Sequence, residues 1–166
     1  MNDIKLKFLF QFFALVLVQV LIFDHVYFLG YINPYIYIAF IIALPLKLNR
    51  NYLIFLGFLI GLCVDLFNDT GGIHAGSSVL IAYLRSIIVR LSFGYNYDLD
   101  TLKLRNVKLK AQLTFITIMV FAHHLIMFSL AYFSLNYTVE ILKNTLYSGI
   151  FSSILIFMTK SLLKKQ

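Results

Sequence analysis

The sequence predicts an all-α integral membrane protein with six transmembrane helices, and two observations lead to this prediction. Of the 166 residues, 61% are hydrophobic and 13% are charged, and the mean hydropathy is +0.87. Such a composition cannot cover a water-soluble globule of this size. The apolar residues also occur in runs that approach the roughly 17–25 residues a helix needs to cross a bilayer.

The first expected helix covers about residues 8–23. It follows a charged start, as a signal peptide does, but no small-residue cleavage site comes after it, so we expect it to be retained. Gln11 and Gln19 are eight residues apart and share one face of this helix, where both could hydrogen-bond to a neighbouring helix. For Gln11, a position at the membrane interface is an equally good explanation.

The remaining elements follow in order. Asn33 and Pro34 predict a turn that opens a second helix at about 35–46. This helix is short for a full span, so either it tilts little in a thin region or the residues before it dip into the membrane. Helices at about 52–67 and 73–91 are joined by a tight turn of Asn, Asp and two glycines. After a basic loop at 92–111, helices at about 112–133 and 139–163 complete a single membrane domain over 1–166.

Lysine and arginine are distributed unevenly over the expected loops. With six spans, nearly all of them fall on the side that holds both termini, and the other side keeps Lys143 together with Asp24, Asp69 and Glu140. Cytoplasmic loops are enriched in lysine and arginine. We therefore expect both termini in the cytoplasm. This topology explains the net charge of +7, so we expect no nucleic acid partner.

Gly57, Gly61 and Asp65 recur every fourth residue and so lie close to one face of the third helix. The small residues predict a groove that admits a partner helix, with the carboxylate at its end. Asp65 lies near the outer end of its helix, within reach of water, His74 or Lys143. An ionisable residue in an apolar helix is a functional candidate. We favour a structural or assembly role for it, with partner binding and proton handling or transport as alternatives.

Three further ionisable residues lie within expected helices. Arg85 is about 20 Å from the turn before its helix, so we expect it to extend with Arg90 towards the cytoplasm rather than to pair with Asp65. Contact with a lipid headgroup or a partner carboxylate is the alternative. His123 and His124 point about 100° apart on a helix, which excludes a metal pair. We expect neutral histidines that hydrogen-bond to neighbouring helices, because no acid faces them for a proton relay.

The basic loop interleaves leucine with Lys103, Arg105, Lys108 and Lys110, a pattern typical of a segment that lies on anionic lipid headgroups. Docking of a cytosolic protein is the alternative. The sequence holds no glycine-rich phosphate loop, no HExxH motif and no nucleophile elbow. We therefore expect no catalytic residues, no cofactor and no metal, and a protein that is not an enzyme.

The stretch from Gly57 to Tyr83 resembles the rod shape-determining protein MreD family. The family pattern is a Gly-x-x-x-Gly-x-x-x-Asp helix end, a short turn with a Gly-apolar-His step, and an apolar helix with a tyrosine. Gly57, Gly61 and Asp65 match its first part. Matches to the later parts, and to the proline before the second helix, are Gly72, Ile73, His74, Tyr83 and Asn33-Pro34.

The resemblance implies a non-enzymatic subunit of the bacterial cell-elongation complex in the cytoplasmic membrane. Its expected partner is an MreC-like membrane protein, and beyond it MreB, RodA and a class B transpeptidase of peptidoglycan synthesis. A groove formed by Gly57 and Gly61, with Asp65 and His74, would then receive an MreC helix. The family has also been likened in fold to substrate-binding subunits of vitamin transporters. The rival hypothesis is therefore a subunit that binds a small solute entering near Asp65 and His74.

Overall fold

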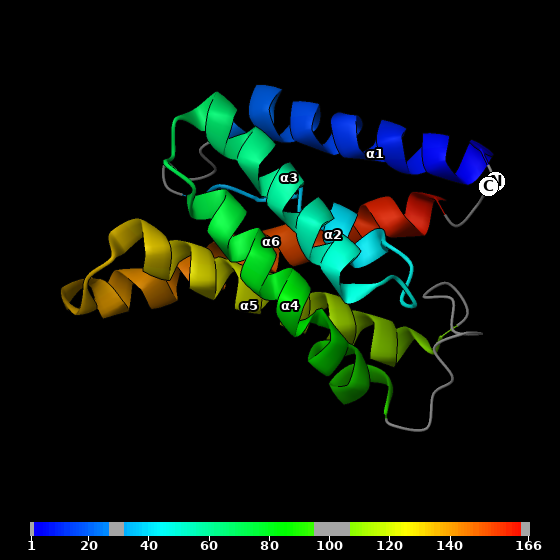
Figure 1. Cartoon of the computed structure of the whole chain (residues 1–166). Coiled ribbons are helices and arrows are strands. Elements are labelled where there is room, and N and C mark those ends of the chain that lie inside the picture. The colour runs from blue at the N-terminus through cyan, green and yellow to red at the C-terminus, as the bar shows by residue number, and fades with distance from the viewer. Residues whose placement is uncertain (1, 27–31, 95–106, 164–166) are drawn as a thin grey trace.

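The computed structural model describes the backbone of residues 2–26, 32–94 and 107–163, and within these ranges the chain is almost entirely helical (Figure 1). Two short 3-10 turns, η1 and η3, accompany six α-helices. In chain order the elements are α1 (Asn2–Leu21), η1 (Phe23–His25), α2 (Ala39–Ala43), α3 (Arg50–Asn68), α4 (Ile73–Phe93), α5 (Leu109–Tyr132), η3 (Leu135–Tyr137) and α6 (Thr138–Leu163).

Five helical stretches within the described residues are long and apolar enough to cross a membrane. Four of them, α3 to α6, begin and end within three residues of the positions predicted from the sequence. The first helix begins at Asn2, six residues earlier than predicted, and so includes the charged start of the chain. The tight turn between α3 and α4 is also confirmed, since Asp69, Gly71 and Gly72 adopt left-handed backbone conformations there. The chain is therefore a multi-pass membrane protein, as predicted.

The predicted second helix is wrong in length. In place of a helix over about 35–46, only the five residues of α2 are helical. Pro45 provides the physical reason at one end, because a residue before proline is driven out of the helical region and Leu44 has ψ 149. At the other end, the amides of Tyr35 and Ile36 bond to side chains of other helices. Residues 32–49, which we call the interrupted segment, are thus mostly non-helical.

The interrupted segment nevertheless passes through the whole bundle. Asn68, the last residue of α3, donates a hydrogen bond to Asp24 just after α1, so these two helices end together. At 1.5 Å per residue α3 is about 28 Å long, so its first residue, Arg50, lies about that far from the end where Asn68 meets Asp24. The chain after Asp24 must cover this distance before α3 can start. On the way, the side chains of residues 36–38 and 40–42 are buried, at 0–6% exposure. Non-helical backbone at membrane depth is tolerated only where protein surrounds it.

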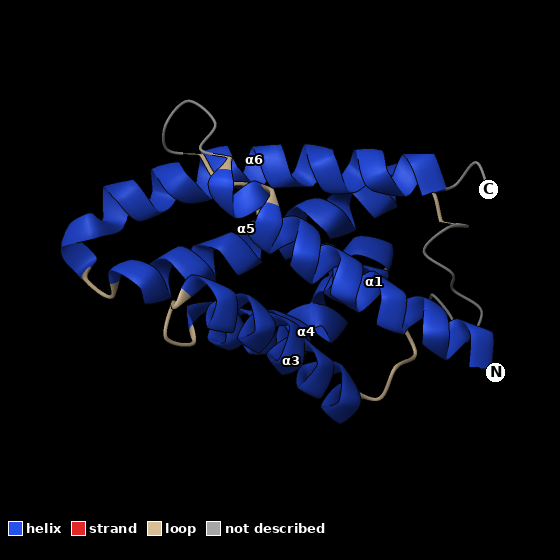
Figure 2. Ribbon diagram, turned by 90° about the horizontal axis from the view of Figure 1, so that it is seen from above, coloured by secondary structure: helices blue, strands red, loops and turns tan. Residues whose placement is uncertain are grey.

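Counting this segment, the described part of the chain crosses the bundle six times, by five helices and by one largely irregular segment. In agreement, the beginning of α1 and the end of α6 lie at the same end of the molecule (Figures 1 and 2). Figure 2 also shows that α5 and α6 form a long antiparallel hairpin beside α3 and α4.

Candidate functional site

Gly57 and Gly61 form a groove on α3, as predicted, but α4 of the same chain occupies it. A Cβ atom on Gly57 would lie 3.0 Å from the Ser78 carbonyl oxygen, and one on Gly61 would lie 2.6 Å from the Cα of Ala75. Both glycines are buried by this contact. The expectation that this groove receives a helix of another protein is therefore corrected: its small residues allow the two helices of one hairpin to approach closely.

Asp65 closes the same hairpin from the end of α3. Its Oδ1 accepts hydrogen bonds from the His74 amide (3.0 Å) and the Thr70 hydroxyl, and its Oδ2 accepts one from the Ala75 amide (2.7 Å). Gly72, at the N-cap of α4, has no side chain to offer. The carboxylate of Asp65 supplies the missing cap and lies at the positive end of the helix dipole. Its partners are these groups rather than the His74 ring or Lys143, which the sequence suggested.

Gln19, near the end of α1, is fully buried and binds the start of the interrupted segment. Its Oε1 accepts hydrogen bonds from the amides of Ile36 (2.7 Å) and Tyr37 (3.3 Å). Its Nε2 donates to the carbonyl of Pro34 (3.2 Å) and to Asp24 (2.7 Å). The predicted interhelical hydrogen bond of Gln19 is therefore made to backbone groups that have no helical partner.

Ser152 and His124 bind the same segment from α6 and α5. The Ser152 hydroxyl accepts a hydrogen bond from the Tyr35 amide (2.9 Å) and also contacts His124 Nε2 (3.1 Å). His124 Nδ1 lies 2.8 Å from the Val120 carbonyl. Because a carbonyl can only accept, Nδ1 carries a proton, and in a neutral ring Nε2 then accepts from the Ser152 hydroxyl. His124 thus orients the serine that receives the Tyr35 amide.

Tyr37 lies at the centre of a second buried network. Its hydroxyl is 3.0 Å from His74 Nδ1 and 2.8 Å from His123 Nε2. The Ser77 hydroxyl donates to the His74 carbonyl (3.1 Å) and lies 3.2 Å from the same His123 nitrogen. One assignment satisfies these contacts: His123 Nε2–H donates to Ser77 and Tyr37, and Tyr37 donates to His74. The two adjacent histidines on α5 therefore serve different partners, as their 100° separation predicts.

Arg85 does not extend to the surface, contrary to the sequence-based expectation. Its side chain is 2% exposed and points to the end of α2. There Nη1 donates to the Pro45 carbonyl (3.2 Å) and Nη2 to the Leu44 carbonyl. Carbonyls at a helix end lack helical partners, and of these two the Pro45 carbonyl also accepts a hydrogen bond from the Leu48 amide (3.2 Å). Arg85 thus does for the end of the interrupted segment what Gln19 does for its start.

Three of the other predicted contact residues lie at the opposite end of the helices from Asp65. Arg90, Lys108 and Lys110 are exposed. Lys103 and Arg105 lie outside the described residues. A cavity of about 80 Å³ opens where α3 begins and α4 ends, and Arg50, Arg85 and Arg90 contribute to its wall.

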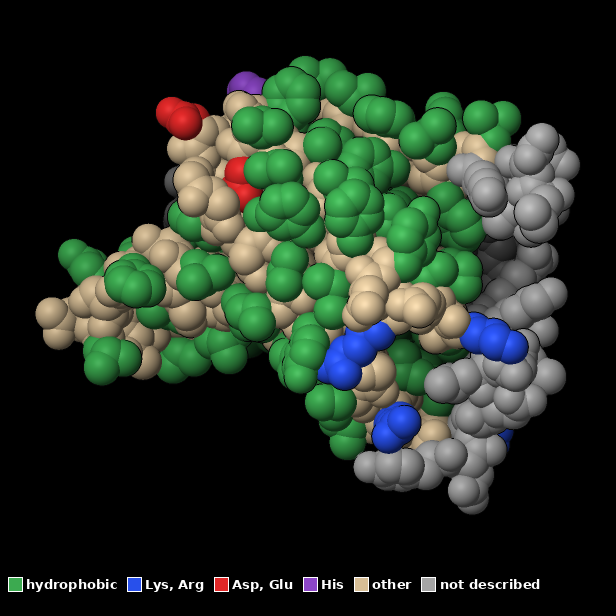
Figure 3. Space-filling model, viewed as in Figure 1, with side chains coloured by type: hydrophobic (Ala, Val, Ile, Leu, Met, Phe, Trp, Pro, Cys, Tyr) green, Lys and Arg blue, Asp and Glu red, His purple; other side chains and the backbone are tan. Residues whose placement is uncertain are grey.

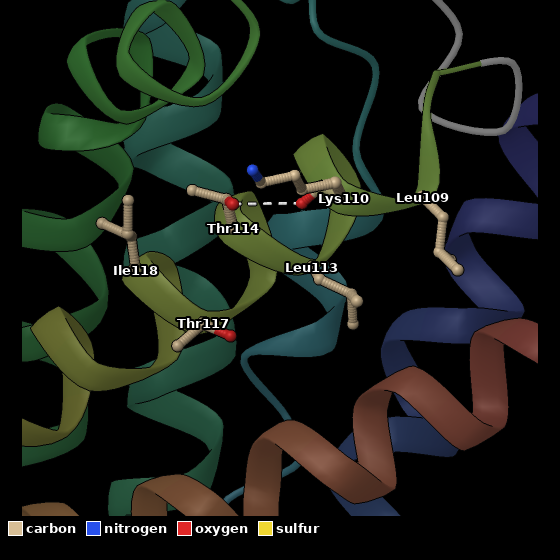
Figure 4. Close-up of a pocket in the computed structure, with 6 residues that line it drawn as sticks. All are labelled: Leu109, Lys110, Leu113, Thr114, Thr117 and Ile118. Atoms are coloured by element: carbon tan, nitrogen blue, oxygen red, sulfur yellow. Dashed lines mark hydrogen bonds between the residues drawn. The ribbon is translucent and has the colours of Figure 1, made fainter.

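An open depression lies on the first half of α5 (Figure 4). All of its lining residues belong to that one helix, and the Thr114 hydroxyl donates to the Lys110 carbonyl of its own helix (3.0 Å). It is therefore the outer face of α5 rather than a binding site. The residues drawn are Leu109, Lys110, Leu113, Thr114, Thr117 and Ile118.

No family model, no curated protein and no solved structure matches this chain. The resemblance to the MreD family stays a prediction, and the geometry of the chain itself has to support any functional proposal. Among the described residues, no group of three or more His, Cys, Asp or Glu side chains could hold a metal ion. The feature that stands out is the set of buried polar side chains around the interrupted segment.

Proposed function

We propose that this protein is a non-enzymatic scaffold subunit of the bacterial cell-elongation complex in the cytoplasmic membrane, as the resemblance to MreD implies. One observation supports this proposal most. The polar side chains inside the bundle bind the protein's own backbone: Gln19, Arg85 and Ser152 hold the interrupted segment, and Asp65 caps α4. Ionisable residues inside a membrane usually mark a functional pathway, but here they fix the shape of the molecule.

The rival hypothesis of a solute-binding subunit receives less support. Its entrance was expected near Asp65 and His74, where polar groups would contact the solute. Both Asp65 oxygens already accept hydrogen bonds from the turn and the start of α4, and the His74 ring contacts Tyr37. A solute at this place would have to compete with bonds that hold the fold.

The distribution of charge supports an orientation with both termini in the cytoplasm. On the face seen in Figure 3, lysine and arginine side chains gather at the end where α3 begins and α4 ends. Acidic side chains lie at the opposite end, and a broad hydrophobic surface separates the two. The basic end is the one that holds the start of α1 and the end of α6 (Figure 1). The positive-inside rule assigns that end to the cytoplasm.

Because α4 covers the Gly57–Gly61 face, an MreC-like helix needs another surface, and α1 is our proposal. Of its membrane-spanning window, 11% is buried within the molecule, compared with 33–44% in the other four spans. Leu9, Phe13 and Leu17 are about half exposed on it. A partner helix packed on α1 would bury this surface, and through that partner the subunit would reach MreB, RodA and the class B transpeptidase.

Cysteine crosslinking in cells tests this proposal. In a Cys63→Ala background, a cysteine replaces Phe13 or Leu17 on α1, and Leu142 or Leu146 on the outer face of α6 serves as the matched control. We expect the MreC-like protein of the same bacterium to co-purify and to crosslink to α1 only. Absence of co-purification would contradict the scaffold function, whereas crosslinks confined to α6 would contradict only the binding face.

A further inference from the structure

The cavity at the basic end of the molecule has an unusual lining. It lies between the end of the interrupted segment, the first turn of α3 and the second half of α4. Three arginines, Arg50, Arg85 and Arg90, and the hydroxyl-bearing Ser86 form its polar part, and leucine, alanine and valine side chains form the rest. Its volume of about 80 Å³ exceeds that of one water, which needs roughly 10–15 Å³.

Among the described residues, Arg50 and Arg85 are held in place by groups other than a carboxylate. The guanidinium carbon of Arg50 lies 3.8 Å from the centroid of the Tyr83 ring, a cation–π contact that fixes its orientation. Arg85 donates to two carbonyls, and its buried Nε has no hydrogen-bond partner within the described part of the chain. None of the described residues that line the cavity is acidic. Three positive charges around a small space, with no negative charge among the described residues of its wall, favour an anion there.

The arginines of this cavity differ in exposure, so a ligand would enter from the side of the exposed ones. Arg50 and Arg90 are exposed, whereas Arg85 is 2% exposed and lies deeper. On α4, positions 82, 85, 86, 89 and 90 recur at helical spacing, so this stripe of the helix faces the cavity. The cavity is located towards the helix ends, where lipid headgroups lie, and its wall combines these charges with apolar side chains.

We propose that this cavity binds a phosphate group, with Arg50 and Arg90 as its ligands at the mouth and Arg85 as the positive charge beneath. Guanidinium groups match phosphate oxygens with two parallel hydrogen bonds, and their charge is not lost at any physiological pH. The mixed wall fits the phosphodiester of an anionic phospholipid, whose glycerol part would contact the leucines. A free phosphate ion presents the same chemistry without the apolar part.

Native mass spectrometry of the full-length protein in a neutral detergent tests the site. The probes are phosphatidylglycerol, phosphatidylcholine and inorganic phosphate, and the variants are Arg90→Gln and Arg50→Gln. Lys110→Gln is the matched control, because Lys110 is an exposed cation at the same end of the molecule but outside the cavity. We expect wild type to retain phosphatidylglycerol at least fivefold better than either arginine variant, and Lys110→Gln to behave as wild type.

The probes separate the sources of the phosphate. Retention of phosphatidylglycerol but not of inorganic phosphate identifies a lipid site, and saturable binding of both, lost in the same variants, identifies a general phosphate site. Equal retention by wild type and both arginine variants would overturn the proposal. So would equal retention of phosphatidylcholine and phosphatidylglycerol. Unfolding temperatures of all variants within a few degrees of wild type show that the comparison is between folded proteins.

Discussion

Gly61 lies where the backbones of α3 and α4 are in close contact. A Cβ there would lie 2.6 Å from the Cα of Ala75, a distance that real Cβ contacts essentially never show. The neighbours that would have to move are backbone atoms, which cannot rotate away. A larger residue at 61 therefore separates the hairpin, so Gly61→Leu would measure the stability of the fold rather than the binding of a partner.

We expect Gly61→Ala to destabilise the protein by about 1–3 kcal/mol, the usual range for overpacking a tight contact. Gly76→Ala is the matched control within α4, because its Cβ would meet only the end of the Leu130 side chain, at 3.2 Å. That side chain can move, and alanine favours a helix over glycine by about 1 kcal/mol, so Gly76→Ala should be neutral or stabilising. Thermal unfolding in detergent measures the stability of both variants. An equal loss of stability in Gly61→Ala and Gly76→Ala would contradict the close approach of α3 and α4 at Gly61.

Asp65 caps α4 with both carboxylate oxygens, so we expect Asp65→Asn to cost about 1–2 kcal/mol. The amide nitrogen of asparagine would face a donor, either the Ala75 amide or the His74 amide with the Thr70 hydroxyl. Asp69→Asn, four residues on, provides the control because Asp69 is exposed and asparagine tolerates its left-handed conformation. Chemical denaturation should show a lower free energy of unfolding for Asp65→Asn than for Asp69→Asn. An equal decrease in both variants would contradict the capping role.

At the scale of the element, the interrupted segment depends on side chains from three helices. Local backbone hydrogen bonds connect residues 36–44 around the short α2 and join Leu48 to Pro45, but the backbone groups at 34–36 and the Leu44 carbonyl bond to side chains of other helices. Gln19 from α1, Ser152 from α6 and Arg85 from α4 provide hydrogen bonds instead. Lipid cannot replace these hydrogen bonds, so the buried backbone groups of the segment depend on these side chains for their partners.

Gln19→Leu should therefore destabilise the protein by at least about 2 kcal/mol, since two buried amides and a carbonyl lose their partner at about 1–3 kcal/mol per group. Gln11→Leu is the control, because Gln11 lies on the same helix and is only half-buried. Hydrogen exchange measured by mass spectrometry should show faster exchange across residues 34–37 in Gln19→Leu alone. Unchanged exchange there would contradict the role of Gln19.

The same element marks the limit of what the sequence could predict. The other helices and the tight turn follow from apolar runs and turn residues, which are local signals. The shape of residues 32–49 is set by partners from helices far along the chain, as in the contact of Tyr35 with Ser152. A signal did exist, because Gln19 and Arg85 are polar residues in apolar helices and Pro45 lies where the predicted helix should continue. The spacing of Gly57 and Gly61 predicted close packing but could not identify α4 as the neighbour.

At the scale of the whole molecule, the irregular crossing determines the topology. Five helices alone would place the two termini on opposite sides of the membrane. The interrupted segment adds a sixth crossing, which brings the start of α1 and the end of α6 to the same end of the bundle (Figure 1). The basic side chains gather at that end (Figure 3). The proposed cytoplasmic orientation of both termini and the proposed phosphate ligand of the basic cavity both depend on this sixth crossing.

Reporter fusions at the two termini test that crossing most directly. Green fluorescent protein, which is fluorescent in the cytoplasm, and alkaline phosphatase, which is active only outside it, are fused in turn to the N-terminus and to the C-terminus, and after Asn136 between α5 and α6 as a control. We expect fluorescence and no phosphatase activity at both termini, and the reverse at Asn136. Termini on opposite sides of the membrane would show that residues 32–49 do not cross it, and would contradict this account.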